Sequence, residues 1–579
     1  MSLFHWFIFF LLVQIIHGLG TCKLYINAGR KSWEAFIPVY NSIVLMKIIN
    51  RPTWWTFLLF IPIINLIMFP VVWIETLRSF GKNSTIDTWL GILTCGFYIY
   101  YINYTQDVKY IADRSLVAKT KTGDTVSSLL FAIVVATLVH TYVMQPYTIP
   151  SSSLEKSLLI GDFLFVSKFH YGARVPMTSV AAPMVHDTIP FIKTKSYLYD
   201  DNNPESLKNK LQLHYFRFPG FEKIKNADIV VFNWPRDTLF HMYKPADRRY
   251  SKPIDKKTNY VKRCVGIAGD SLQIKNGDVF INGKLLVLPE RAKPQYAFNI
   301  KLKEPLTQEF VEQNEIKEFN RVVRIQAKLW DNTVVQKYLA DEGYNLHQVS
   351  KDSTEVLIVG QVDDDLATKL GLSYSENFFQ GNLTQQKANN LKNDYRVADV
   401  SRYIKSGVED GIYPDMQDGR PSMTNNWNSD NFGPIYIPKA GVTVKLDTKS
   451  LPFYKIIISE YEKNKLKVIG NDIFINNKKA TTYTFKQNYY WMMGDNRNNS
   501  LDARYFGYTP EDHIVGKPVF IWMSWDTNGK GINKIRWERL FTTVGGDGQP
   551  KSYFKYFLGL LALYFVGDYF WKKRKASKV

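Results

Sequence analysis

Cysteine is scarce in this sequence. Only three cysteines occur among its 579 residues, and Cys22, Cys95 and Cys264 fall in three separate regions of the chain. We therefore expect no internal disulfide. A folded domain in this chain must be stabilised by packing and hydrogen bonding.

The chain also lacks the ligand spacing of a metal site. An acidic trio stands at 363–365, but no ordered set of oxygen ligands surrounds it, as a calcium site would require. We interpret the trio as part of a solvated loop. The sequence therefore predicts no metal and no cofactor.

A nucleic-acid motif is missing as well, although the formal net charge is +20. The lysines and arginines are dispersed along the chain, and no nucleic-acid-binding fold signature accompanies them. A membrane surface explains the basic excess better, because long apolar runs occur in the same chain. We expect no nucleic-acid partner.

Five apolar runs approach the roughly 20 residues that a helix needs to cross a bilayer. They predict membrane helices near residues 3–18, 54–73, 88–104, 126–145 and 553–571. Lysines and arginines crowd three stretches, which the positive-inside rule assigns to the cytoplasm. These stretches are 23–51, 109–121 and the basic tail 572–579.

This assignment divides the chain into an N-terminal membrane region, 1–125, with cytoplasmic loops, and an outer domain that begins at residue 146. With five crossings, residues 146–552 lie outside the cytoplasm between two membrane helices. The first twenty residues could instead be a cleaved signal peptide. They carry no basic n-region, so we favour a retained membrane helix.

The outer domain reads as β-structure. Short β-branched and aromatic runs bounded by Gly, Asn, Asp and Pro occur in residues 146–286 and 468–552, which predicts a mainly β catalytic domain in two parts. Two similar segments, IKNGDVFINGKLL at 274–286 and VIGNDIFINNKKA at 468–480, suggest equivalent hairpins around an insertion. The insertion, 287–467, mixes helical and strand patterns and is expected to form an α+β subdomain.

A cluster of serines follows the fourth apolar run, in the segment YTIPSSSLEKSLLIG at 147–161. A triple serine alone is more typical of a linker than of a catalytic site. Three further segments change that interpretation. They are KNADIVVFNWP at 225–235, NYVKRCVGIAGDSLQI at 259–274 and YYWMMGDNRNNSLDARYFGYTPEDHIVG at 489–516.

The order and content of these four segments resemble signal peptidase I of bacteria, membrane enzymes that remove targeting peptides from exported proteins. The resemblance covers the fourth apolar run and nearly all of the outer domain except the insertion. It implies a signal-peptidase-like β fold and a serine endopeptidase that works through an acyl-enzyme without metal or cofactor. By position, Ser153 corresponds to the nucleophile and Lys262 to its general base.

The same resemblance implies roles for further residues. Ser151 corresponds to a hydroxyl that joins the Ser153 backbone N–H in the oxyanion hole, and Ser500 to a serine that orients the lysine. Supporting residues would be the buried pair Asp502 and Arg504 and the turn residues Gly494, Asp495 and Asn496. Shallow substrate pockets would be lined by Ile149, Pro150, Leu154, Leu158 and Tyr260.

The residue types agree with this chemistry. A serine hydroxyl is a poor nucleophile until a neighbouring base takes its proton, and a lysine can be that base only when its amine is neutral. Burial disfavours the ammonium and so favours the neutral amine. Because Val261, Val265 and Ile267 lie near Lys262 in the sequence, we expect an apolar setting.

Two positions depart from the family pattern. Leu154 and Lys156 stand where the family carries methionine and proline, and we expect alanine or proline at 156 to retain activity. Residues 153–156 also form the Ser-x-x-Lys of penicillin-binding enzymes and β-lactamases. That family's accessory motifs, Ser-Asp-Asn and Lys-Thr-Gly, occur at 429–431 and 121–123.

Order and topology disfavour this second interpretation, because residues 121–123 precede the serine and are assigned to the cytoplasmic side. A catalytically inactive membrane-anchored scaffold of the same fold is a further alternative. The changed residue at 156 and the large insertion favour it, whereas the intact serine, lysine and oxyanion hydroxyl argue against it.

The resemblance also implies a substrate and a location. Substrates would be exported preproteins with small residues at the first and third positions before the cut. The protein would be a multi-pass component of the bacterial inner membrane, with its catalytic domain in the periplasm. The lipid bilayer and the protein translocation machinery would be its further partners.

Overall fold

The structure is a computed structural model that describes residues 2–118, 120–203, 205–240, 248–344, 346–414 and 426–576. The chain divides into two compact units. The first comprises Met1–Pro146, Ser167–Lys223 and Phe232–Tyr260, and the second comprises Tyr147–Val166, Ile224–Val231 and Val261–Val579.

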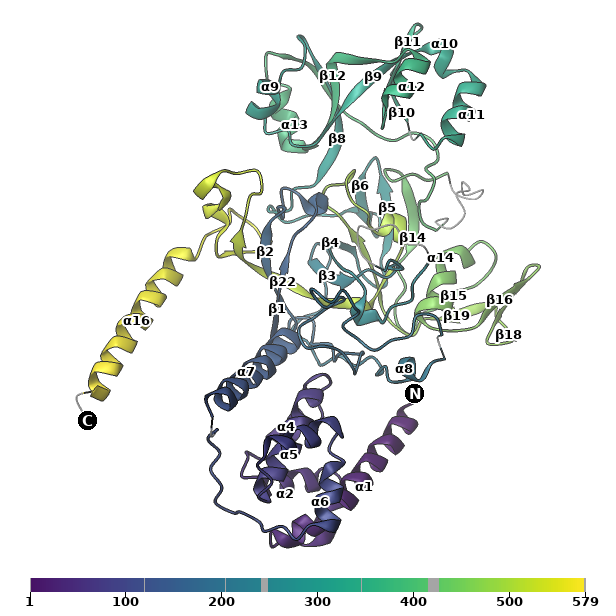
Figure 1. Ribbon diagram of the computed structural model, residues 1–579. Helices are drawn as coiled ribbons and strands as arrows, with labels where there is room; N and C mark the ends of the chain where they lie inside the picture. The colour runs from purple at the N-terminus through teal and green to yellow at the C-terminus, as the bar shows by residue number, and fades with distance from the viewer. Residues whose placement is uncertain are drawn as a thin grey trace. The chain divides into compact units, whose positions relative to one another are not determined.

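Helices make up the N-terminal part of the first unit (Figure 1). They are α1 (Leu3–Asn27), α2 (Tyr40–Ile48), α3 (Trp55–Leu58), α4 (Ile64–Ser79), α5 (Thr85–Leu93), α6 (Tyr98–Thr105) and α7 (Lys121–Leu138). Helix α1 contacts α6, and α4 contacts both α5 and α7. Fully buried side chains such as Val44, Met46 and Ile64 form a common core between these helices.

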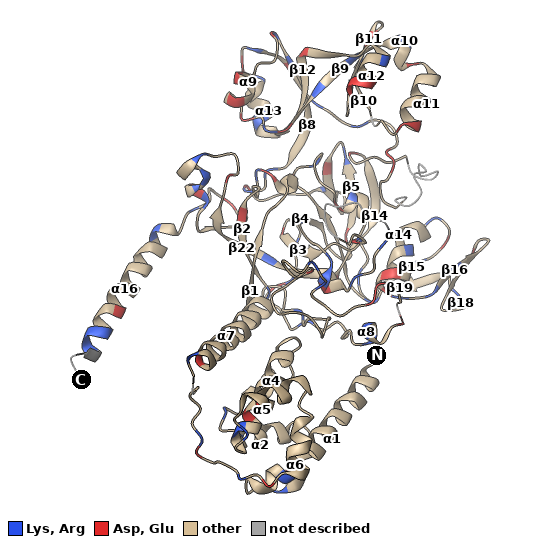
Figure 2. Cartoon of the chain, viewed as in Figure 1, with Lys and Arg blue, Asp and Glu red and all other residues tan. Residues whose placement is uncertain are grey.

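Two helices in the described part of the chain are long and apolar enough to cross a bilayer, Leu3–Asn27 and Lys121–Val143. Figure 2 shows few charged residues along α1 and α7. The second span extends α7 by a π-helical turn at Val139–Val143. Both coincide with apolar runs that predicted membrane helices.

The prediction of five membrane helices is corrected at 54–73 and 88–104. Both runs are split into short helices, because the backbone enters the left-handed region at Ile63 (φ 71°) and at Cys95 (φ 51°). Helix α4, with 16 residues, is about 24 Å long and does not span a hydrocarbon core of about 30 Å.

The C-terminal helix α16 (Phe554–Ala576) has 23 residues. It is long enough to cross a bilayer but is not among the two candidate spans, because Lys555 and Asp568 interrupt its apolar sequence. Its apolar side chains are nevertheless exposed, including Leu560 and Leu563. Residues 577–579 of the expected basic tail lie outside the described residues.

An eight-stranded sheet forms the centre of the β-structure, in the order β1-β2-β22-β3-β4-β20-β21 with β23 paired to β22. The strands are β1 (Met144–Thr148), β2 (Asp162–Ser167), β3 (Ile229–Asn233), β4 (Asn259–Gly266), β20 (Tyr489–Met493), β21 (Thr509–Pro510), β22 (Ile514–Ser524) and β23 (Thr542–Thr543). Strands far apart in the sequence are thus neighbours, and β4 pairs with β20 antiparallel. The expected mainly β character of the outer domain is confirmed.

The two similar sequence segments fold as similar three-stranded meanders. The first is β5 (Ser271–Lys275), β6 (Asp278–Ile281) and β7 (Lys284–Leu285), and the second is β16 (Leu466–Ile469), β17 (Asp472–Ile475) and β18 (Lys478–Lys479). In the first, Asn276 (φ 50°) and Gly277 (φ 81°) form a two-residue turn, as the Asn-Gly pair favours.

The insertion contains a six-stranded antiparallel sheet in the order β10-β11-β9-β12-β8-β13 (Figure 1). Its strands are β8 (Gln295–Leu302), β9 (Phe319–Gln326), β10 (His347–Lys351), β11 (Glu355–Val359), β12 (Ser373–Thr384) and β13 (Val397–Arg402). Helices α9 (Gln308–Gln313), α10 (Ala327–Trp330), α11 (Thr333–Asp341), α12 (Asp364–Leu370) and α13 (Gln385–Leu391) accompany it. The acidic trio begins α12, where Asp363 accepts a hydrogen bond from Leu366 N–H, so it is a helix N-terminus and not a loop.

The last part of the insertion returns to the catalytic strands. Strand β14 (Phe432–Tyr436) pairs with β5, and β15 (Thr443–Lys445) pairs with β19 (Thr482–Thr484). The sequence pattern predicted that the insertion ends at residue 467. The six-stranded sheet ends well before that residue. The helix α14 (Leu451–Ile456) follows β15.

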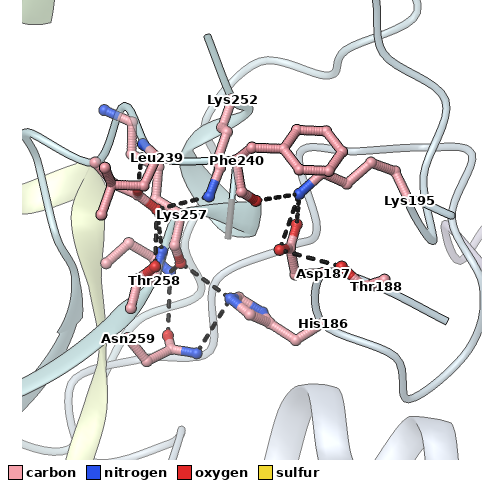
Figure 3. Close-up of polar contacts among 12 residues, drawn as sticks. His186, Asp187, Thr188, Lys195, Leu239, Phe240, Lys252, Lys257, Thr258 and Asn259 are labelled. Carbon is pink, nitrogen blue, oxygen red and sulfur yellow. Dashed lines mark hydrogen bonds and ion pairs between the residues drawn. The ribbon is translucent and has the colours of Figure 1, made fainter. Parts of the chain in front are cut away.

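An irregular stretch of the first unit, within residues 167–260, is ordered by side-chain hydrogen bonds instead of long strands (Figure 3). The buried carboxylate of Asp237 pairs with Lys252 at 3.1 Å and accepts a 2.8 Å hydrogen bond from Thr258 N–H. Nε2 of His186 donates to the carbonyl oxygen of Lys257 at 2.9 Å. Two of these bonds satisfy backbone groups, the Thr258 N–H and the Lys257 carbonyl, that a sheet would otherwise pair.

Candidate active site

A short 3-10 turn at Ser152–Leu154 carries the predicted nucleophile. Ile149, Leu154 and Leu158 lie on either side of Ser153 and are at most 3% exposed, within an apolar cluster that also includes residues of β2, β3 and β22. These anchors hold the turn at both ends. Ser153 itself is 6% exposed.

Lys156 leaves the turn with a left-handed backbone, at φ 70°. A helix therefore does not continue from Ser153 to Lys156. Proline fixes φ near −65°, so the expectation that proline would be tolerated at 156 is wrong for this backbone. The Lys156 amine lies 4.0 Å from the Glu315 carboxylate.

Lys262 reaches the serine from the middle of β4. Its Nζ lies 2.6 Å from Oγ of Ser153, and a hydrogen bond joins the two atoms. The lysine is 4% exposed. Because β4 lies between β3 and β20 in the sheet, its position is set by strand pairing and does not depend on the serine turn.

Burial lowers the pKa of Lys262 to about 8, since an ammonium loses its hydration inside the protein. The nearby carboxylates of Asp502 and Asp495 oppose this shift, and the Arg504 guanidinium adds to it. A substantial fraction of the amine is thus neutral near pH 8, as a general base requires.

Asp502 and Arg504 form a fully buried ion pair next to β20. Two hydrogen bonds of 2.9 Å join the guanidinium to the two carboxylate oxygens. The carboxylate also accepts a 3.0 Å bond from Gly494 N–H. Burial alone would raise the pKa of Asp502, but Arg504 holds it below its usual value, so the pair remains ionised.

A second buried pair joins β4 to the loop after β20. Arg263 donates to both oxygens of Asp495, at 2.8 and 2.6 Å, and Ser157 Oγ donates to the same carboxylate at 2.6 Å. Arg263 is the neighbour of Lys262, so this bidentate pair fixes the strand beside the base. Asp495 was predicted from the sequence as a supporting residue, whereas Arg263 was not, although it follows Lys262 directly in the same motif.

The loop after β20 also donates hydrogen bonds to the backbone carbonyls of the nucleophile turn. Asn496 N–H donates to the Ser153 carbonyl at 3.1 Å, and its side-chain Nδ2 donates to the Ser152 carbonyl at 3.3 Å. A Cβ at Gly494 would lie 2.6 Å from the Ser153 carbonyl oxygen. Glycine is therefore required for this close approach.

Within the described part of the chain, Ser500 and Ser151 form no hydrogen bond that tests their predicted roles. Oγ of Ser500 is buried and, among the described residues, has no hydrogen-bond partner, so its orientation of Lys262 stays a prediction. Ser151 is exposed and precedes the serine turn. Its place in the oxyanion hole also stays a prediction.

The predicted substrate-binding residues differ in their surroundings. Ile149, Leu154 and Leu158 pack in the apolar core, and Pro150 is exposed. Tyr260 stacks on Trp234 within the first unit, with ring centroids 5.1 Å apart. Contacts of all five with substrate stay predictions.

The motifs of the Ser-x-x-Lys interpretation take part in local structure. Ser429 N–H donates to Glu409, and Asp430 accepts a 2.9 Å bond from Lys405 N–H. Residues 121–123 begin α7, where the Thr120 side chain accepts from Gly123 N–H. These contacts do not involve Ser153, whose hydroxyl is hydrogen-bonded to Lys262.

Comparisons with known proteins agree with this geometry. The family described as signal peptidase, peptidase S26, matches residues 122–360 and 441–525, and a family of unknown function matches residues 33–113. A signal peptidase I from Buchnera aphidicola subsp. Schizaphis graminum is 23% identical over 78% of this chain and 93% of its own length. A second, from Buchnera aphidicola subsp. Baizongia pistaciae, is 21% identical over 69% of this chain and 76% of its own. A third, from Rickettsia typhi, is 26% identical over 28% of this chain and 47% of its own.

Proposed function

Because this chain belongs to the signal peptidase family, peptidase S26, we propose that it is a membrane-bound serine endopeptidase that removes N-terminal signal peptides from exported preproteins. The observation that carries this proposal is the 2.6 Å contact between the buried Lys262 amine and the Ser153 hydroxyl. An inactive scaffold would have no need of a buried lysine with a lowered pKa at a serine.

In the first half of the reaction, Oγ of Ser153 attacks the scissile carbonyl carbon while neutral Lys262 takes the hydroxyl proton. The C–N bond then breaks, Lys262 returns the proton to the departing amine, and the mature protein leaves. An ester joins the signal peptide to Ser153. Lys262 next takes a proton from a water, which attacks the ester carbon. The C–Oγ bond then breaks, Lys262 returns the proton to Oγ of Ser153, and the signal-peptide carboxylate leaves.

Negative charge develops on the carbonyl oxygen at each tetrahedral stage. We assign its stabilisation to the Ser153 N–H and the Ser151 hydroxyl. The loss of one such donor typically costs about 3 kcal/mol in the transition state. The pairs Asp502–Arg504 and Arg263–Asp495 support the site by fixing the loop after β20 and the strand that carries Lys262.

The substrate class gives the first test of this function. Purified protein in liposomes should cleave a preprotein with alanine at the first and third positions before the cut. Tryptophan at the first position should lower kcat/KM by about 10- to 100-fold, because overfilling a small pocket costs about 1–3 kcal/mol. The rates are measured by gel, and the new N-terminus by sequencing.

A tryptophan placed well inside the mature part is the matched control and should change the rate little. Equal cleavage of the substrates with alanine and with tryptophan before the cut would contradict the proposed specificity. An interaction of this chain with the protein translocation machinery is a further proposal. It is tested by comparing cleavage in liposomes with and without that machinery, and an unchanged rate would contradict a required interaction.

We also propose three membrane crossings, by α1, α7 and α16, in the bacterial inner membrane. The basic stretches 23–51, 109–121 and 572–575 then all lie in the cytoplasm, as the positive-inside rule favours, and the catalytic domain lies in the periplasm. Omitting two of the five predicted crossings leaves this orientation unchanged. It moves only the connection between α4 and α5 from the periplasm to the cytoplasm.

That connection decides between three and five crossings. With Cys22, Cys95 and Cys264 replaced by serine, Asn83→Cys should resist a membrane-impermeant maleimide added to intact spheroplasts and react after the membrane is opened. A cysteine in place of the exposed Asn393 should react without opening the membrane. Reaction of Asn83→Cys in intact spheroplasts would favour five crossings.

A further inference from the structure

Glu318 comes from the insertion but reaches the catalytic loop. It directly precedes β9, and its neighbours Ile316 and Phe319 belong to the apolar cluster of the insertion. Its carbonyl oxygen accepts a 3.0 Å hydrogen bond from Asn382 N–H on β12. The insertion's own core therefore fixes the backbone from which this carboxylate projects.

The Glu318 carboxylate accepts hydrogen bonds from two asparagine side chains of the catalytic loop. Oε2 lies 2.8 Å from Nδ2 of Asn496, and Oε1 lies 3.1 Å from Nδ2 of Asn499. The same two nitrogens also donate to Ser152. Asn496 donates to its carbonyl at 3.3 Å, and Asn499 to its hydroxyl at 2.8 Å.

These contacts fix which way the two amides face. A primary amide has two N–H donors on one side and an acceptor oxygen on the other, whereas a carboxylate only accepts. Glu318 therefore holds both nitrogens toward itself and toward Ser152. Oδ1 of Asn496 is buried without a hydrogen-bond partner among the described residues, so that end of the amide contributes no bond that would fix its orientation.

The orientation matters because of the planar peptide bond. The Ser152 carbonyl and the Ser153 N–H belong to one rigid peptide unit. Holding the carbonyl by Asn496 thus also sets the direction of the N–H. That N–H is the backbone donor proposed above for the oxyanion.

We infer that Glu318 is a positioning residue for the oxyanion hole, which acts through the Asn496 amide on the peptide unit between Ser152 and Ser153. This inference rests on the proposed function. It makes the insertion a working part of the active site. Glu318 touches no reacting atom, so its effect is on kcat and not on the protonation of the base.

The test compares full-length Glu318→Ala and Glu318→Gln with wild type on a fluorogenic peptide and on a preprotein. We expect Glu318→Ala to lower kcat by about 10- to 100-fold and to change KM by less than about twofold. This decrease in kcat should not exceed the decrease that follows the loss of an oxyanion donor. Glu318→Gln keeps one acceptor oxygen and should lose less. The pH at half-maximal activity should stay the same, because Lys262 is untouched.

Glu315→Ala is the matched control, since Glu315 lies on the same segment with a side chain 76% exposed, and it should retain full kcat. In an Asn496→Ala background, Glu318→Ala should add little, because the two residues act in series. If Glu318→Ala does not fold, Glu318→Gln provides the test. We expect this variant to lower kcat by about 3- to 10-fold.

Unchanged kcat in both Glu318 variants, or additive losses with Asn496→Ala, would overturn the inference while leaving the proposed function intact. Measuring Ser153→Ala in the same assay distinguishes a failure of this inference from a failure of the proposed function. If Ser153→Ala is active, the proposed nucleophile fails, and the role of Glu318 fails with it.

Discussion

Ser153→Ala should abolish preprotein cleavage while the protein still folds and inserts into the membrane. Loss of the nucleophile in a serine peptidase costs on the order of 10⁶-fold in kcat. The substitution removes one small polar atom whose hydrogen bond joins Lys262, and the anchors Leu154 and Leu158 stay in place. Cleavage is measured in liposomes, and folding by thermal denaturation.

Ser152→Ala is the matched control for this experiment. Ser152 lies next to the nucleophile, but its hydroxyl accepts a hydrogen bond from Asn499 at 2.8 Å, whereas Lys262 bonds to Ser153. We expect this variant to keep at least about a tenth of wild-type kcat, since one exposed hydrogen bond is worth about 1 kcal/mol. Substantial activity in Ser153→Ala would move the nucleophile to Ser151 or Ser152.

The sequence could predict the reacting pair because its residues stand inside specific motifs. Ser153 and Lys262 were paired by resemblance across more than a hundred residues, and the structure brings their side chains to 2.6 Å. The apolar setting expected for Lys262 came from Val261 and Val265, yet alternate residues of a strand face opposite sides. Burial within the sheet, not these neighbours in the sequence, lowers the lysine pKa.

The supporting contacts could not be predicted in the same way. Glu318 stands in an insertion with no recognisable motif, and its place beside Asn496 depends on how β9 and β12 pair. Gln295 accepts and donates backbone hydrogen bonds with the loop of Asp495 and Arg497, which no sequence pattern indicates. Such contacts join residues about two hundred positions apart, and only tertiary structure brings them together.

The membrane helices show a different limit. A hydropathy window measures how apolar a stretch of sequence is. It does not detect a change of backbone direction within that stretch. The run at 54–73 is broken by the left-handed Ile63, and the run at 88–104 by Cys95. The runs at 3–18 and 126–145 contain no such break and form the two candidate spans.

The two lysines near the nucleophile should differ sharply when each is replaced by alanine. Lys262→Ala should eliminate acylation and hydrolysis, a loss on the order of 10⁶-fold as for the nucleophile, because Lys262 is the base that is hydrogen-bonded to the Ser153 hydroxyl. Lys156→Ala should keep most activity. Its side chain is about one third exposed, and its amine lies 4.0 Å from the Glu315 carboxylate. Acylation is followed with a serine-directed probe.

The pH profile of the wild type tests the same assignment. With the pKa of Lys262 lowered to about 8, the neutral base increases as pH rises through 8, so kcat/KM should fall about tenfold per unit below that pH. Lys156→Ala should keep this profile, because the base is untouched. An inactive Lys156→Ala beside an active Lys262→Ala would instead assign the base to Lys156, and the Ser-x-x-Lys mechanism would replace the one proposed.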